Sequence, residues 1–393
     1  MNKRPVALLA WELGSGFGHS RRLLLIATAL RERGYDPIVA ARELWASADD
    51  YRAAGIPLIQ APMHQSQAPP GKPFQARSYA DILAICGFER LDALRPIVTG
   101  WDNLIRLLAP SIIIADYSPL LTLAAHGWIP LITIGDGFVV PPPELKRFPL
   151  VRVEGTRMSD EAVLLQNARA LQRERQLSEP LSLPKLIGGQ RHVVCTFPET
   201  DIYAKERHGL AGGPLDSIKE PLPRPPGRGI FAYLAADYPL TAKFLQVLID
   251  TKLKAEVYVR GASPALGHAL TSGGVRVYEK PPPLEEVLAR ASLLVHHGGI
   301  GTSEACIALG RAQLLVPRHL EQSLNAACLR ELGVAASLRA NFSLVDAQSA
   351  ILENISSEGM LNRAHELAHL VGSRGSSTSM DTILRACDEC RLQ

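Results

Sequence analysis

Short apolar runs alternate with amphipathic stretches along most of the chain. The first run, VALLAW, is followed by a glycine-rich turn and by HSRRLLLIATALRERG, in which apolar residues recur at helical spacing until Gly34. This order predicts a strand, a loop and a helix. Further strands are predicted in the first half of the chain at PIVAARE, IPLIQAP, SIIIAD, PLITIG and HVVCTF. Because strands that alternate with helices form parallel sheets covered by helices, this half predicts a doubly wound α/β domain.

A second series of the same kind follows a segment rich in proline and glycine. KEPLPRPPGRG has the composition of a linker between domains. After it, strands are predicted at GIFAYLA, AEVYVRG, VRVYE, SLLVHH and AQLLVP. The chain is therefore predicted to form two Rossmann-like domains, residues 1–222 and residues 229–375. Residues 141–187 are assigned to an excursion of the first domain, and residues 376–393 to a C-terminal helix or tail.

Composition narrows the class of protein. Of the 393 residues, 47% are hydrophobic and 21% are charged, as in an ordinary globular protein. Lys and Arg number 42 and Asp and Glu number 39, which gives a net charge of +3. The chain therefore lacks the basic field that non-specific binding of nucleic acid needs, and no nucleic-acid partner is expected.

The cysteines and the apolar runs favour the cytoplasm. Six cysteines spread along a long chain do not form the pattern of a small secreted disulfide domain, and the first apolar run lacks a signal-peptide cleavage pattern. The longest stretch without Lys, Arg, Asp or Glu, residues 117–135, is interrupted by prolines and a glycine, so no transmembrane segment is predicted. Cys387 and Cys390 form a single CxxC pair, too little for a zinc site, and are predicted to lie in an exposed tail.

The segment LLVHHGGIGTSEACIALG holds the first candidate site. A buried strand ends at His296 and His297, a glycine turn follows, and Thr302 is predicted to open a helix. Glycines let the backbone approach a ligand closely, and the free amides at a helix start favour a phosphate group. His297 is expected to add a hydrogen-bond donor there, whereas His296 is interpreted as a packed strand residue. The turn amides belong to Gly298, Gly299 and Gly301.

The next strand, LLVP, is followed by Glu321 and Gln322. Ligands of open α/β sheets bind at the carboxyl ends of the strands, where this pair is expected. A carboxylate and an amide can hydrogen-bond several hydroxyl groups, as recognition of a sugar requires.

The glycine loop GSGFGHSRR near the N-terminus is the second candidate site. Taken alone, the loop also fits a dinucleotide-binding turn of a dehydrogenase, with Glu43 on the ribose. The later segment, with its His-Gly-Gly and Glu-Gln elements, is not explained by a nicotinamide enzyme.

The later segment resembles the donor-binding signature of family 1 nucleotide-sugar glycosyltransferases of the GT-B fold. That signature has a His, a turn of small residues and a Ser or Thr, followed by a Gly, a Pro, an acid with Gln, and Asn-Ala. In this chain the matching residues are His297, Thr302, Gly310, Pro317, Glu321, Gln322, Asn325 and Ala326. The resemblance implies two Rossmann-like domains in the GT-B arrangement, with the reaction in a cleft between them.

The resemblance also implies roles for residues at the donor site. His297, the turn amides and Thr302 would hold the diphosphate, Glu321 and Gln322 the sugar, and Glu304 the ribose. The nucleobase, uracil or thymine, stays open. The first strand of the second domain ends in AYLAADYP where the family has Gly-Ser, so the resemblance implies no donor contact from that loop.

In the first domain the resemblance implies that His19 is the general base for the acceptor hydroxyl. The family supplies an aspartate at the end of a later strand to orient this histidine, and Asp116 fits that place. Asp116 could instead cap the helix that begins near Pro119. Gly16, Phe17 and Gly18 belong to the acceptor-side loop.

The function implied is transfer of a sugar from a UDP- or dTDP-sugar to a small-molecule or lipid-linked acceptor, with inversion. Neither metal nor cofactor is expected, because the nucleotide sugar is a co-substrate and the helix start supplies positive partial charge. Two alternatives stay open at this point. One is a nucleotide-sugar epimerase or hydrolase of the same fold, and the other is a noncatalytic nucleotide-sugar binding protein.

Overall fold

The computed structural model describes residues 4–14, 17–45, 47–63, 74–152, 155, 160–209, 211–215, 218–339, 341–374 and 378–391. The chain forms two compact units, which are described separately. The first comprises Met1–Asp216 and Thr378–Gln393, and the second comprises Ser217–Ser377. The division falls before the predicted domain end at residue 222, and the C-terminal segment belongs to the first unit.

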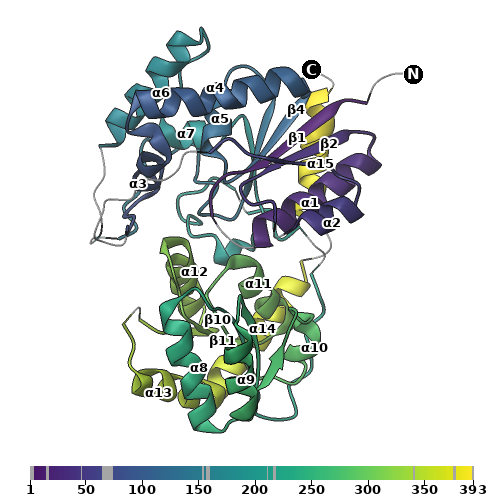
Figure 1. Cartoon of the computed structure of the whole chain (residues 1–393), viewed down its shortest axis with the longest axis vertical. Helices are drawn as coiled ribbons and strands as arrows, with labels where there is room; N and C mark the ends of the chain where they lie inside the picture. The colour runs from purple at the N-terminus through teal and green to yellow at the C-terminus, as the bar shows by residue number, and fades with distance from the viewer. Residues whose placement is uncertain are drawn as a thin grey trace. The chain divides into compact units, whose positions relative to one another are not determined.

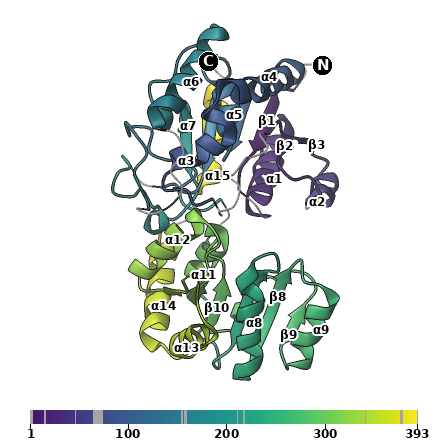
Figure 2. The ribbon, with the colours of Figure 1, turned by 60° about the vertical axis from the view of Figure 1, so that its left-hand side comes forward.

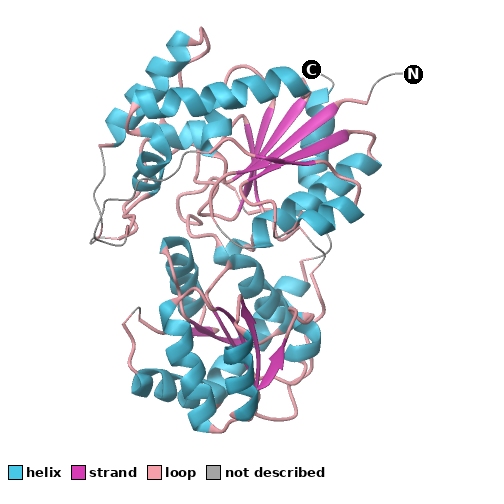
Figure 3. Ribbon diagram, in the orientation of Figure 1, coloured by secondary structure: helices cyan, strands magenta, loops and turns pink. Residues whose placement is uncertain are grey.

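Parallel strands form the sheet of the first unit, in the order β3-β2-β1-β4-β5-β6 (Figures 1 and 3). They are β1 (Val6–Trp11), β2 (Asp36–Ala41), β3 (Leu58–Gln60), β4 (Ile112–Asp116), β5 (Leu131–Gly135) and β6 (Arg191–Val194). All six were predicted as strands. Their central members are apolar at nearly every position because helices cover both faces of the sheet.

Helices of the first unit pack on the two faces of this sheet. They are α1 (Phe17–Glu32), α2 (Ala48–Ala53), α3 (Tyr79–Leu83), a π-helical turn (Ala84–Phe88), α4 (Leu91–Leu108), α5 (Pro119–Ala125), α6 (Glu161–Glu174), α7 (Leu183–Ile187), a 3-10 turn (Pro198–Thr200) and α15 (Ser379–Arg391). Leu9 and Trp11 of β1 share a core with Ile26 of α1 and Ile383 of α15. On the other face, α5 contacts β4 and β5, and α4 packs on α5.

The second unit has a parallel sheet in the order β12-β11-β10-β7-β8-β9. Its strands are β7 (Ile230–Ala235), β8 (Ala255–Arg260), β9 (Arg276–Tyr278), β10 (Leu293–His296), β11 (Ala312–Leu315) and β12 (Ala335–Ser337). The first five were predicted. β12 was missed because three residues at a sheet edge are too short for a strand pattern to appear.

Helices α8 (Pro239–Thr251) and α13 (Leu344–Ile355) share one core with the second sheet, and α10 (Leu284–Leu288) and α11 (Ile300–Leu309) share another. Figure 2 shows α8 and α9 (Pro264–Ser272) beside β8 and β9, and α11 and α14 (Glu358–Gly372) beside β10. The remaining helix, α12 (Leu320–Glu331), follows β11. The prediction of a doubly wound α/β fold is confirmed in both units.

The prediction of an exposed tail for Cys387 and Cys390 is wrong. Helix α15 packs against β4, β5 and β6 of the first unit, and Cys387 is buried in that unit's core. Its apolar positions lie on one helical face, and the strands supply the surface that covers them. The sequence pattern predicts such a face, but it does not say which unit receives it.

Candidate functional site

The loop after β1 brings His19 to the end of β4. Trp11, the last residue of β1, pairs in register with Asp116, the last residue of β4, so the two strands end at the same edge. His19 lies in the first turns of α1, and its Nδ1 is 3.1 Å from Asp116 Oδ1. The structure thus brings together the two residues for which a joint role was predicted.

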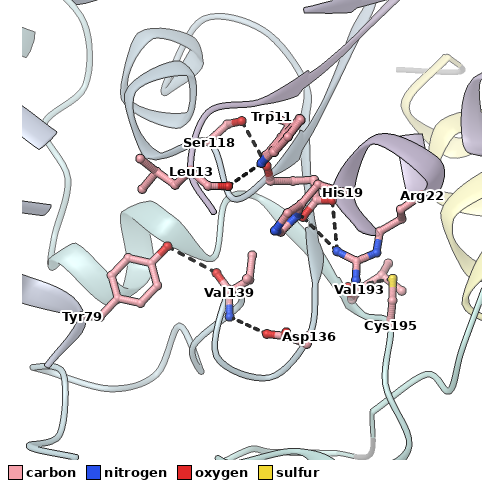
Figure 4. Close-up of polar contacts among 11 residues, drawn as sticks. Trp11, Leu13, His19, Arg22, Tyr79, Ser118, Asp136, Val139, Val193 and Cys195 are labelled. Atoms are coloured by element: carbon pink, nitrogen blue, oxygen red, sulfur yellow. Dashed lines mark hydrogen bonds and ion pairs between the residues drawn. The ribbon is translucent and has the colours of Figure 1, made fainter. Parts of the chain in front are cut away.

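Arg22, one turn after His19, contacts the same carboxylate. Its Nη1 lies 3.0 Å from both carboxylate oxygens of Asp116, which is fully buried. Figure 4 shows the side chains of His19 and Arg22 next to each other. Burial alone raises the pKa of Asp116, but the charges of Arg22 and His19 outweigh it, so the pKa is lowered. Sequence reasoning missed Arg22, although its spacing of three from His19 places both on one face of α1.

Two aromatic rings pack close to the His19 imidazole. The Trp11 ring stacks on it with centroids 5.4 Å apart, and the Tyr117 ring lies 6.0 Å away. Tyr79 and Phe138 extend this cluster beyond Tyr117. The imidazole orientation is therefore fixed by packing as well as by the Asp116 carboxylate.

Gly14 lies against the Nε2 edge of the ring. A Cβ atom at this position would be 2.6 Å from His19 Nε2, and the backbone of Gly14 has φ +82°, which favours glycine. With Nδ1 facing Asp116, Nε2 is the ring nitrogen on the side that Gly14 leaves free of a side chain. It is the atom available to accept a proton from a ligand.

Glu12 caps α5, the role that sequence reasoning considered for Asp116. Its two carboxylate oxygens accept hydrogen bonds from the backbone N–H groups of Leu120 and Leu121, at 2.9 and 2.7 Å. Burial raises the pKa of Glu12 to about 8, although these hydrogen bonds act against the shift. Asp116 is thereby free of the capping role and contacts His19 and Arg22.

The acceptor-side loop is described only in part. Gly16 and the side chain of Phe17 lie outside the described residues, and Phe17 is the first residue of α1. Gly18 lies in the first turn of that helix, is exposed, and a Cβ there would meet nothing within 4 Å.

The turn after β10 has the geometry that its glycines predict. Gly298 has φ +86°, and a Cβ there would lie 3.1 Å from the carbonyl oxygen of Gln322. Gly299 is the N-cap of α11, and a Cβ at Gly299 or Gly301 would meet nothing within 4 Å. Helix α11 begins at Ile300, so the prediction that Thr302 opens it is two residues late. Thr302 lies in its first turn.

His297 differs from its predicted use as a donor to a diphosphate. Its Nδ1 lies 2.9 Å from the carbonyl oxygen of Val316, to which it donates, and its Nε2 accepts the backbone N–H of Ala235 at 3.0 Å. Burial lowers the pKa of His297 to about 4, so the ring is neutral near pH 7. In this structure it has no N–H left for a ligand and ties the ends of β7, β10 and β11 together.

His296 is the packed strand residue that was expected. Its Nε2 pairs with Gln313 Oε1 at 3.0 Å, and its Nδ1 accepts the backbone N–H of Gly298 at 3.1 Å. Burial lowers its pKa to about 4. Through these hydrogen bonds His296 links the glycine turn to β11.

The remaining predicted donor residues lie on α11 and α12. Glu304 is only 7% exposed, so a ribose contact from it stays a prediction. Glu321 and Gln322 are half-buried in the first turn of α12, and Gln322 Oε1 accepts the backbone N–H of Arg318 at 2.9 Å. Asn325 Nδ2 donates to the carbonyl oxygen of Gly298 at 3.1 Å. Asn325 thus fastens α12 to the turn before α11, whereas Gln322 binds the segment that leads into α12.

Within the part of the chain that the structure describes, no helix is long and apolar enough to span a membrane. The same residues contain no group of three or more His, Cys, Asp or Glu side chains arranged to hold a metal ion.

Known proteins similar to the chain are glycosyltransferases. No family model matches the chain. The L-demethylnoviosyl transferase of Streptomyces niveus is 27% identical over 365 residues, which cover 90% of this chain and 86% of that protein. The structure of the glycosyltransferase SsfS6 of Streptomyces sp. SF2575, complexed with thymidine diphosphate, has a TM-score of 0.64 at 17% identity and covers 98% of this chain and 99% of its own. That of the spinosyn rhamnosyltransferase SpnG, complexed with spinosyn aglycone, has a TM-score of 0.67 at 16% identity and covers 98% and 100%.

The fold is therefore that of GT-B enzymes, and the relative that matches along most of the chain is a sugar transferase. The chain is a glycosyltransferase with the GT-B fold, as the resemblance implied. The dehydrogenase interpretation of the first glycine loop is set aside, and so is the noncatalytic binding protein.

Proposed function

We propose that this glycosyltransferase transfers the sugar of a UDP- or dTDP-sugar to a hydroxyl group of a small-molecule acceptor, with inversion at the anomeric carbon. The observation that carries the proposal is the placement of His19, whose Nδ1 faces the buried Asp116 while its Nε2 lies beside Gly14. The likeness to SsfS6, solved with thymidine diphosphate, and to SpnG, solved with an aglycone, supports the two classes of substrate.

In the proposed reaction His19 Nε2 takes the proton of the acceptor hydroxyl. The acceptor oxygen forms a bond to the anomeric carbon, while the bond from that carbon to the diphosphate oxygen breaks on the opposite face. The electron pair leaves with the nucleoside diphosphate. Asp116 stabilises the imidazolium cation that forms, and Arg22 holds the carboxylate in place.

The leaving diphosphate would be bound at the turn between β10 and α11. The first backbone amides of α11 and its dipole favour an anion there. Glu321 and Gln322 are proposed to bind the donor sugar, because they lie at the carboxyl edge of the same sheet. The proposed reaction needs no metal, and transfer should continue in excess EDTA.

Replacement of the proposed base tests this function. His19→Ala is expected to lower kcat by about 10² to 10⁴, the usual contribution of general-base catalysis, while the Kd for dTDP or UDP stays within about twofold of the native value. The acceptor is first found by mass detection of products from a panel of alcohols and phenols. His208→Ala removes an exposed histidine of the same unit and is the control. Turnover that survives His19→Ala would reject the assignment.

A further inference from the structure

An ion pair crosses the carboxyl end of β10, where the proposed donor site begins. Arg318 follows β11 and Asp237 follows β7, and these two strands are the neighbours of β10 in the sheet. Arg318 Nη2 lies 2.9 Å from Asp237 Oδ2. Because the partners lie on either side of β10, the pair passes over its end. The hydroxyl of Tyr238 makes a second link of this kind by donating to the carbonyl oxygen of Pro317 at 3.2 Å.

The guanidinium is held in place more firmly than its carboxylate partner. The side chain of Arg318 is 20% exposed and that of Asp237 is 64% exposed. The guanidinium carbon lies 5.8 Å from the centre of the Tyr238 ring, and the same ring packs edge-on against His297. An ion pair with so exposed a carboxylate adds little to folding stability, and an anion that binds two of the guanidinium N–H groups can replace the carboxylate.

The chemistry of the proposed donor site calls for a cation at this position. The His297 ring donates to Val316, and the loop after β7 has no Gly-Ser to supply hydroxyl contacts. Arg318 and Arg260 both act electrostatically on His297, which places their charges near the turn before α11. A diphosphate carries more negative charge than the partial charge of one helix start can match, and a guanidinium supplies the difference.

We infer that Arg318 binds the diphosphate of the donor, and that Asp237 holds the guanidinium over the end of β10 until the diphosphate displaces it. The inference rests on the proposed function, because it concerns the same donor. It assigns opposite effects to the two members of the pair. Arg318 contributes a charge-assisted contact to the bound anion, whereas Asp237 competes with that anion for the same guanidinium.

The test measures binding of dTDP and of UDP by isothermal titration calorimetry in four proteins. Arg318→Gln is expected to weaken binding of the diphosphate that the native enzyme prefers by about tenfold or more, the usual effect of losing a hydrogen-bonded charge. Asp237→Asn is expected to leave that affinity unchanged or to tighten it by about two- to fivefold. Arg363→Gln removes an exposed arginine paired with Glu366 on α14 and serves as the matched control, with native affinity expected.

The outcomes separate this inference from the function on which it rests. Native affinity of Arg318→Gln for a diphosphate that the wild type binds would overturn the inference alone. Equal weakening by Arg318→Gln and Asp237→Asn would overturn it too, because it would show that the pair only supports the fold. A wild-type protein that binds neither dTDP nor UDP would overturn both. If Arg318→Gln does not fold, Arg318→Lys keeps the charge without the planar fork, and a loss of about threefold or more is then expected.

Discussion

Gly14 and His19 show how one missing side chain can define a reactive atom. The ring is fixed by Trp11 on one side and by the Asp116 carboxylate at Nδ1, so only the Nε2 edge is left to meet a ligand. A Cβ at residue 14 would lie 2.6 Å from that nitrogen, well inside contact distance. The glycine therefore serves the turn through its positive φ and the base through its lack of a side chain.

Gly14→Ala is expected to lower kcat by about tenfold or more, because the methyl group displaces or covers His19 Nε2. The positive φ should also cost about 1 to 2 kcal/mol of stability. Gly34→Ala is the control, since Gly34 has φ +85° and a Cβ there would meet nothing within 4 Å. Steady-state kinetics and urea unfolding of both variants separate the two effects. A similar loss of kcat in both would show that only backbone strain matters.

At the scale of elements, the end of β1 and the start of α5 are joined through a single carboxyl group. Glu12 follows β1 directly and accepts two backbone N–H groups of α5, which leads away from the end of β4. The contact fixes the loop that carries Tyr117 and Ser118 between the two elements. Because Glu12 is 1% exposed, its protonation affects folding.

Stability should fall with pH through the titration of Glu12. Its pKa is raised from 4.5 to about 8 in the folded protein, so between these values the folded state keeps a proton that the unfolded state has released. The free energy of unfolding then falls as pH rises from about 4.5 to 8, by up to about 1.4 kcal/mol per pH unit from this group.

Glu12→Gln removes that slope. Urea unfolding of the native and variant proteins at pH 5, 6, 7 and 8 is expected to give a difference in stability that shifts steadily in favour of the variant as pH rises. Glu32→Gln, a change at an exposed position of α1, should run parallel to the native curve. Parallel curves for Glu12→Gln as well would contradict the assigned pKa.

At the scale of the whole molecule, the path of the chain between the two units determines which hydrophobic core contains the last helix. After the second unit the chain returns to the first, and α15 completes the core between α1 and β4 to β6. The last helix thus belongs to the unit that carries His19. Its loss would expose the apolar surface of that unit while leaving the chain of the second unit uninterrupted.

Ile383→Ala is expected to lower the free energy of unfolding of the first unit by about 2 to 5 kcal/mol, since the side chain is fully buried on α15. Hydrogen exchange should show faster opening of β4, β5 and β6 with little change in the second sheet. Arg385→Ala, at an exposed position of the same helix, is the control. Unchanged exchange in those strands would contradict the assignment of α15 to this core.

The sequence by itself determined the two doubly wound sheets, the position of His19 after the loop that follows β1, and the position of Asp116 at the end of β4. Hydrophobic period, glycine turns and motif spacing are local properties, so a linear pattern carries them. The tertiary structure decided which side chains meet across elements: Arg22 on Asp116, Glu12 on α5, His297 on Val316 and Ala235, and Arg318 on Asp237. It also decided which core receives α15. These contacts depend on strand order and register, which side-chain periodicity leaves open because residues far apart in sequence share them.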